Sequence, residues 1–281
     1  NPVTGLQPQN FRLREDGARQ SLAHFAPTRA PVRIVLLVEA NPAVFLIRRD
    51  HLTAARHLLR ALRPEDEVAL ISYSRSLHPE AAFTRDKRTL ERTLDTLGRF
   101  GLGMAEMKLF DAVADTLAWL GPPVRRTAVL VIGTGLDTGS RTAWERLEKL
   151  ASASQVTIFT LATGRLLRME PDDKKSKKKR REETGRATAV DAAFARADER
   201  LRALARASAG TAYFPASAGE LEGIYREIGE RLRNLYSLGY YPADTTRDGR
   251  YRGITIELVD EKGEPLAHRV FARPGYFAPR D

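Results

Sequence analysis

The chain has 281 residues, of which 42% are hydrophobic and 29% charged, enough for one large domain with a closed core. Its 46 Lys and Arg against 36 Asp and Glu give a net charge of +10, which favours acidic partners or anionic surfaces without selecting one. Cysteine is absent, which excludes disulfides, thiolate metal sites and cysteine nucleophiles. No stretch reaches the roughly 20 apolar residues of a membrane span, and the first residues do not have the pattern of a signal peptide.

Four short apolar segments predict a buried, mostly parallel sheet: residues 33–38, 67–73, 127–132 and 155–161. Segments with helical periodicity lie between and after them, at residues 49–62, 86–97, 111–120, 142–150 and 191–207. Strands that alternate with helices are typical of a doubly wound α/β domain, which we place at residues 29–235.

The two ends of the chain have a different pattern. Residues 11–14 alternate and run into a turn, and three further strands are predicted after a helix at 219–235, at residues 236–241, 252–258 and 266–271. Turns at Asp248-Gly249 and Lys262-Gly263 separate these strands. Because a two-stranded fragment alone is marginal, we predict that residues 1–28 and 236–281 together build one small antiparallel β-module.

A charged segment at about residues 165–190 contains five lysines between Lys174 and Lys179 and is predicted to be a solvated insertion. The alternative is a tether for an acidic partner or nucleic acid. No aromatic residue stands among the lysines, so base stacking has no platform and nucleic acid is not the expected partner.

Several short segments carry a family resemblance. They are Val3-Thr4-Gly5-Leu6 and Glu15-Asp16-Gly17 near the start, Leu62-Arg63-Pro64-Glu65-Asp66 and Leu109-Phe110-Asp111-Ala112 in the centre, and Tyr240-Tyr241-Pro242 and Gly249-Arg250-Tyr251-Arg252 near the end. In this combination the chain resembles the bacterial VWFA-related proteins, which contain a von Willebrand factor A (VWA) domain. The resemblance implies the VWA fold and an extracytoplasmic location. It also implies that residues precede Asn1 in the source protein, or that the β-module is short and open at one edge.

The same resemblance implies a metal-ion-dependent adhesion site, made from an Asp-x-Ser-x-Ser loop, a Thr in a second loop and an Asp in a third. This sequence departs from that pattern at every position: Glu39, Asn41 and Ala43 stand in the first loop, Met107 in the second and Thr134 in the third. Since Mg²⁺ needs several hard oxygen ligands, we expect a degenerate site with no bound metal or other cofactor. An atypical Mg²⁺ site is the alternative.

Each of these positions also has a purely structural interpretation. Glu39 would be a surface carboxylate at a strand end, and Met107 would pack under its loop. Asp111 would cap or open its own helix, and Asp137 would cap the helix that begins near Thr142.

Catalysis is not expected. The glycines of Gly133-x-Gly135-x-x-x-Gly139 lack the dinucleotide-binding spacing, which leaves a nucleotide-binding enzyme as a distant alternative. The function predicted is a protein-interaction or adhesion module, or else a subunit of a larger assembly. Its partner-binding residues would surround the strand ends, with Phe100 beside them: Glu39, Asn41, Phe45, Met104, Thr134 and Asp137.

Overall fold

Six strands form the central sheet, in the order β6-β5-β4-β7-β8-β9. The computed structural model describes residues 3–28, 30–40, 48–97, 106–122, 125–168, 184–268 and 270–280. All neighbouring strands are parallel except β6, which is antiparallel to β5. The strands are β4 (Arg33–Glu39), β5 (Glu67–Tyr73), β6 (Leu77–Thr84), β7 (Thr127–Gly133), β8 (Thr157–Ala162) and β9 (Ala212–Tyr213). The predicted doubly wound, mostly parallel sheet is therefore confirmed.

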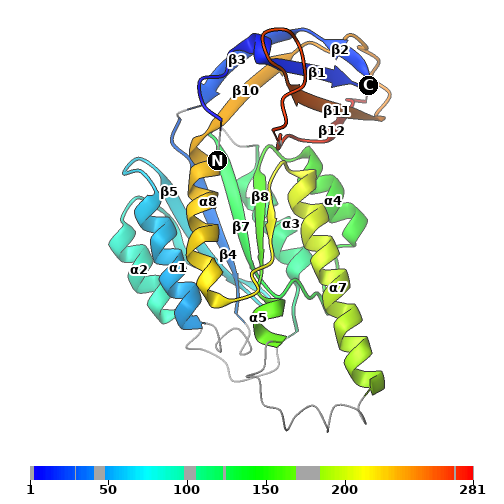
Figure 1. Ribbon diagram of the computed structural model, residues 1–281. Coiled ribbons are helices and arrows are strands. Elements are labelled where there is room, and N and C mark those ends of the chain that lie inside the picture. The colour runs from blue at the N-terminus through cyan, green and yellow to red at the C-terminus, as the bar shows by residue number, and fades with distance from the viewer. Residues whose placement is uncertain are drawn as a thin grey trace.

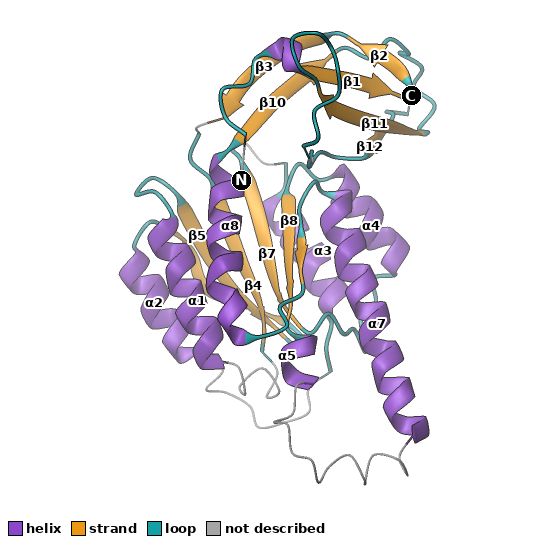
Figure 2. Cartoon of the chain, viewed as in Figure 1, coloured by secondary structure: helices purple, strands orange, loops and turns teal. Residues whose placement is uncertain are grey.

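The sheet lies between two layers of helices (Figure 2). Along β4, Ile34 and Leu36 enter one apolar core and Val35 and Leu37 enter the other, which explains why the strand is apolar without interruption. The first core is covered by α1 (Arg48–Ala61), α2 (Lys87–Thr96) and α8 (Leu221–Arg233). The second core is covered by α3 (Leu109–Leu120), α4 (Trp144–Ala153) and α7 (Thr184–Ala207).

The two chain ends pair with each other in the β-module, as predicted. One sheet has the order β12-β11-β1-β2, and a second sheet pairs β3 with β10. The bounds are β1 (Phe11–Glu15), β2 (Ala18–Gln20), β3 (Leu22–Thr28), β10 (Leu235–Tyr240), β11 (Tyr251–Leu258) and β12 (Gly275–Phe277). The turn predicted at Lys262-Gly263 is present, with Gly263 in the left-handed conformation at φ +81° and its amide donating to the Asp260 carbonyl. The predicted turn at Asp248-Gly249 is wrong: Gly249 also has a positive φ, +71°, but Asp248 bridges to Arg280 and the chain leads into β11 without a turn.

The β-module and the carboxyl ends of the parallel strands lie at opposite ends of the molecule (Figure 1). β3 leads directly into the amino end of β4, and α8 ends two residues before β10 begins. A short helix, α5 (Gly164–Arg168), lies at the opposite end, after β8. Among the helices described, none has the length and hydropathy needed to cross a bilayer.

One further sequence expectation is wrong, and two features were not predicted. The strand predicted at 266–271 is wrong: its described residues, 266–268 and 270–271, belong to no strand, and β12 pairs with β11 instead. The Phe271 ring lies 3.8 Å from the Arg231 guanidinium of α8. β6 was not predicted because it contains Pro79, which an edge strand tolerates. Residues 165–168 and 184–190 of the predicted insertion are helical, and residues 169–183 lie outside the described part of the chain.

Candidate functional site

The Glu39 carboxylate lies at the carboxyl end of β4 and is turned into the protein. Its residue is only 2% exposed, so the expected surface carboxylate is wrong. The Thr134 amide donates a hydrogen bond to Glu39 Oε2 at 2.6 Å, and the Thr134 hydroxyl donates to the same oxygen at 2.8 Å. The side chain that resembles the first metal-binding position thus binds directly to the residue at the third-loop position.

Tyr73 and Gly133 close the space around this carboxylate. The Tyr73 hydroxyl donates to Glu39 Oε2 over 3.5 Å, a long contact. Burial, followed by the nearby charge of Glu39, raises the pKa of Tyr73 well above its ordinary value. A Cβ atom added to Gly133 would come within 2.7 Å of the Tyr73 hydroxyl, so only glycine fits between these groups.

The loop before α3 is joined to the loop after β7. The Met107 amide donates to Thr138 Oγ1 at 2.9 Å, and the Thr138 amide donates to the Met107 carbonyl at 2.8 Å. Met107 itself is 3% exposed, so its apolar side chain is buried. The second and third loops are therefore held together by hydrogen bonds.

Two aspartates extend this junction, and one of them differs from expectation. Asp137 Oδ2 accepts from the Phe110 amide at 3.0 Å and so caps α3, not the helix near Thr142. Asp111, in the first turn of α3, accepts from the amides of Arg141 and Thr142 at 3.0 and 2.8 Å. Asp137, in the loop after β7, thus binds the beginning of α3, and Asp111, on α3, binds the loop after β7. The two contacts are possible because this loop folds back over the beginning of α3.

We name Glu39, Thr134 and the loop residues 106–111 and 134–142 the strand-end face. The Glu39 oxygens accept hydrogen bonds from Thr134, and Met107 offers no hard oxygen in its side chain. Across the described ranges, no group of three or more His, Asp or Glu side chains could hold a metal ion.

The three glycines at and after the end of β7 do not form an open cradle for phosphate. Gly133 faces Glu39, Gly139 faces the Glu106 side chain, and a Cβ on Gly135 would approach Leu201 to 2.6 Å. Protein side chains fill the space beside each glycine. The loop therefore resembles a dinucleotide-binding loop in its glycine content and not in its structure.

The sequence-predicted site residues divide into three groups. Glu39 and Thr134 come together, but both are buried, at 2% and 3% exposure. Asp137 lies nearby in the half-buried loop. The remaining positions, Asn41, Ala43, Phe45, Phe100 and Met104, lie outside the described residues. Direct contact of any of these residues with a partner stays a prediction.

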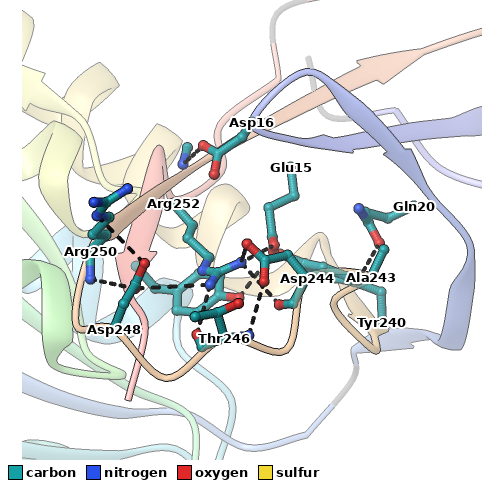
Figure 3. Close-up of polar contacts among 12 residues, drawn as sticks. Glu15, Asp16, Gln20, Tyr240, Ala243, Asp244, Thr246, Asp248, Arg250 and Arg252 are labelled. Carbon is teal, nitrogen blue, oxygen red and sulfur yellow. Dashed lines mark hydrogen bonds and ion pairs between the residues drawn. The ribbon is translucent and has the colours of Figure 1, made fainter. Parts of the chain in front are cut away.

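A second polar cluster, in the β-module, was not predicted as a unit (Figure 3). Glu15 of β1 and Arg252 of β11 face each other at 3.6 Å, and their side chains are 3% and 4% exposed. The hydroxyls of Tyr240 and Tyr276 both donate to Glu15 Oε2, the latter at 3.0 Å. We name Glu15, Tyr240, Arg252 and Tyr276 the terminal latch, because it ties the first β-strand to the last part of the chain.

The loop after β10 wraps around the same arginine. Arg252 donates to the carbonyls of Asp244 and Thr246 at 2.9 and 2.7 Å, and its Nη1 lies 2.7 Å from the Asp244 carboxylate. Hydrogen bonds from Thr246, and then from Arg252, lower the pKa of Asp244 to about 2. Residues from both terminal segments that carry the family resemblance therefore meet in this cluster. Sequence spacing alone does not reveal that they are in contact.

Comparisons with known proteins identify the fold. No family model and no curated protein matches the sequence. Among solved structures, a von Willebrand factor type A protein from Catenulispora acidiphila matches with TM-score 0.51 and 11% identity over 80% of this chain and 50% of its own.

Two further solved structures match over nearly their whole length. The vWF domain of the type V pili tip protein Mfa5 from Porphyromonas gingivalis has TM-score 0.51 and 8% identity over 73% of this chain and 96% of its own. An aerotolerance-related membrane protein from Bacteroides fragilis has TM-score 0.50 and 10% identity over 72% and 98%. With its parallel sheet between two helical layers, the chain has the von Willebrand factor A fold.

Proposed function

We propose that this chain is a non-catalytic protein-interaction module in which the strand-end face works without a divalent cation. One observation carries the proposal: the Glu39 carboxylate is buried and accepts hydrogen bonds from the Thr134 amide and hydroxyl. A cation would have to displace these donors while losing its own tightly held water, and Met107 supplies no compensating oxygen.

In this proposal, direct hydrogen bonds hold the three loops together, as a bridging ion would. Glu39 joins the first loop to the third, and the Met107–Thr138 and Asp137–Phe110 pairs join the second to the third. The carboxylates of the face thus hold backbone amides and hydroxyls in place, which leaves them poorly suited to general acid or base chemistry. The face would present its outer loops to a partner as a fixed shape.

Isothermal titration calorimetry with Mg²⁺, Mn²⁺ and Ca²⁺ tests the cation-free function. We expect no saturable heat from the natural chain, and the same midpoint of thermal unfolding in EDTA and in millimolar MgCl2. The matched control is a variant with the five positions restored: Glu39→Asp, Asn41→Ser, Ala43→Ser, Met107→Thr and Thr134→Asp. It is expected to gain Mg²⁺ binding, whereas saturable micromolar binding by the natural chain would overturn the proposal.

The partner is proposed to be a protein, either one captured transiently or a neighbour in a permanent assembly. The likeness to a domain of a pilus tip protein supports a protein partner by analogy of fold only. The mass of the native particle distinguishes the two versions. A particle larger than the 31.4 kDa monomer supports a subunit, and a monomer at micromolar concentration supports a receptor.

A further inference from the structure

An aromatic stack and an arginine cluster meet at the amino ends of the parallel strands, far from the strand-end face. The rings of Phe83, on edge strand β6, and Trp119, on α3, are stacked with centroids 5.3 Å apart and planes 3° from parallel. Trp119 is 54% exposed, which is unusual for the largest apolar side chain. The Arg33 guanidinium lies 3.8 Å from the Phe83 ring centroid and completes the stack.

Three arginines converge beside this stack on one carboxylate. Glu67 lies 3.5 Å from Arg33, 3.1 Å from Arg85 and 3.8 Å from Arg125. Strand pairing explains the convergence, because Arg33 and Glu67 are register partners at the start of β4 and β5. One carboxylate cannot neutralise three guanidinium groups, and the side chains of Arg85 and Arg125 are 57% and 59% exposed.

We propose that this surface, the arginine–tryptophan shelf (Arg33, Glu67, Phe83, Arg85, Trp119 and Arg125), binds an acidic peptide segment that carries an aromatic residue. The aromatic residue stacks on the exposed face of Trp119, and a neighbouring carboxylate takes the outward donors of Arg85 and Arg125. Glu67 is an internal example of the ligand, because the cluster already binds one carboxylate through charge-assisted contacts.

The same features favour a peptide over nucleic acid. A single-stranded nucleic acid needs cations that follow its backbone and several aromatic platforms for successive bases. The shelf offers one outward ring and a compact group of three arginines around Glu67, not a row of cations that could follow a phosphate backbone past several stacked bases. The proposal is independent of the strand-end face, since its residues lie at the other end of the strands.

Trp119 fluorescence provides the test. The chain contains two tryptophans, so a Trp144→Phe background leaves Trp119 as the single reporter. The probe is a random glutamate–tyrosine copolymer at low salt, compared with polyglutamate and with oligothymidylate. We expect the copolymer to change Trp119 fluorescence and to bind more tightly than either comparison polymer.

Variants then separate the shelf from general charge attraction, with copolymer binding followed by calorimetry. Trp119→Ala should weaken copolymer binding about tenfold, and Trp119→Phe should restore most of it. Arg85→Glu with Arg125→Glu should weaken binding more than the matched exposed pair Arg146→Glu with Arg206→Glu on α4 and α7. Unfolding curves of each variant show whether it is folded, and Arg85→Lys with Arg125→Lys serves as a charge-conserving replacement.

Four outcomes would overturn the proposal: equal loss in the two charge-reversed pairs, no loss in Trp119→Ala, tighter binding of oligothymidylate than of the copolymer, or self-association of the chain that Trp119→Ala abolishes. Because none of these depends on Glu39 or Thr134, failure here is distinguishable from failure of the cation-free function.

Discussion

The two ends of this molecule each contain a buried glutamate, and the two glutamates are stabilised differently. Glu15 of the terminal latch faces a buried arginine, Arg252, and accepts from two tyrosine hydroxyls. Glu39 of the strand-end face accepts from the amide and hydroxyl of Thr134 and, at longer range, from Tyr73. Both residues are almost fully buried, at 3% and 2% exposure.

The difference follows from what each glutamate connects. Glu15 and Arg252 are 237 positions apart, so their pair joins the two ends of the chain and fixes the β-module as one unit. Glu39 connects the ends of two adjacent parallel strands, which the sheet already holds in place. The latch pair therefore links segments from opposite ends of the chain, whereas the hydrogen bonds of Glu39 link loops on two strands that are already paired.

The largest expected effect comes from removing the latch glutamate. Glu15→Ala leaves the hydroxyls of Tyr240 and Tyr276 without their acceptor, and Arg252 keeps Asp244 as its closest carboxylate, so the change should cost about 2–4 kcal/mol of unfolding free energy and roughly 10 °C in the unfolding midpoint. Chemical denaturation followed by circular dichroism measures this cost. Arg14→Ala, an exposed position on the same strand, is the control and should change stability little. A loss no larger than that of the control would show that the latch is not what holds the ends together.

The next effect concerns the strand-end face. Gly133→Ala places a methyl group against Glu39 and the Tyr73 hydroxyl, and should destabilise the chain by about 1–3 kcal/mol through overpacking. Gly223→Ala on α8, where an added Cβ meets nothing within 4 Å, is the matched control and should be neutral or stabilising. If Gly133→Ala behaved like its control, the tight packing around Glu39 would be wrong.

The sequence predicted the α/β domain well because its strands are buried on both faces and its helices have regular periodicity. Ile34 to Leu37 alternate between two cores, and this leaves a continuous apolar run that is easy to recognise. The pairing of the two chain ends was also predictable, since short antiparallel fragments need partners.

The candidate site was less predictable, because tertiary contacts override the local signals there. Glu39 looks like a surface residue in sequence, but Thr134, 95 positions away, supplies the donors that make its burial possible. Asp137 precedes one helix in the chain and caps another, because its loop folds back on α3. Periodicity contains no information about either contact.

A smaller effect tests whether Asp137 caps α3. Asp137→Ala removes the acceptor for the Phe110 amide and should cost about 1 kcal/mol. Asp115→Ala, on the exposed side of the same helix, is the control. Hydrogen exchange adds a local readout: the amide of Phe110 should exchange faster in Asp137→Ala, whereas protection of α4 should stay the same. Faster exchange confined to α4 would instead support the sequence-based prediction that Asp137 caps the helix near Thr142.

Alkaline titration compares the two glutamates directly and has the smallest expected effect at neutral pH. Burial, and then the hydrogen bond to Glu15, raises the pKa of Tyr240, and burial raises that of Tyr73 beside Glu39. A raised folded-state pKa means that the folded chain favours the neutral phenol. Its contribution to stability is therefore complete below the ordinary tyrosine pKa of about 10 and is lost as pH rises above it. Stability measured between neutral pH and strong alkali should fall less steeply in Tyr240→Phe and in Tyr73→Phe than in the natural chain, whereas Tyr241→Phe, at 85% exposure, should leave the slope unchanged. An unchanged slope in Tyr240→Phe would mean that the Tyr240 phenol is not held by Glu15. An unchanged slope in Tyr73→Phe alone would mean that only the latch couples a tyrosine to its glutamate.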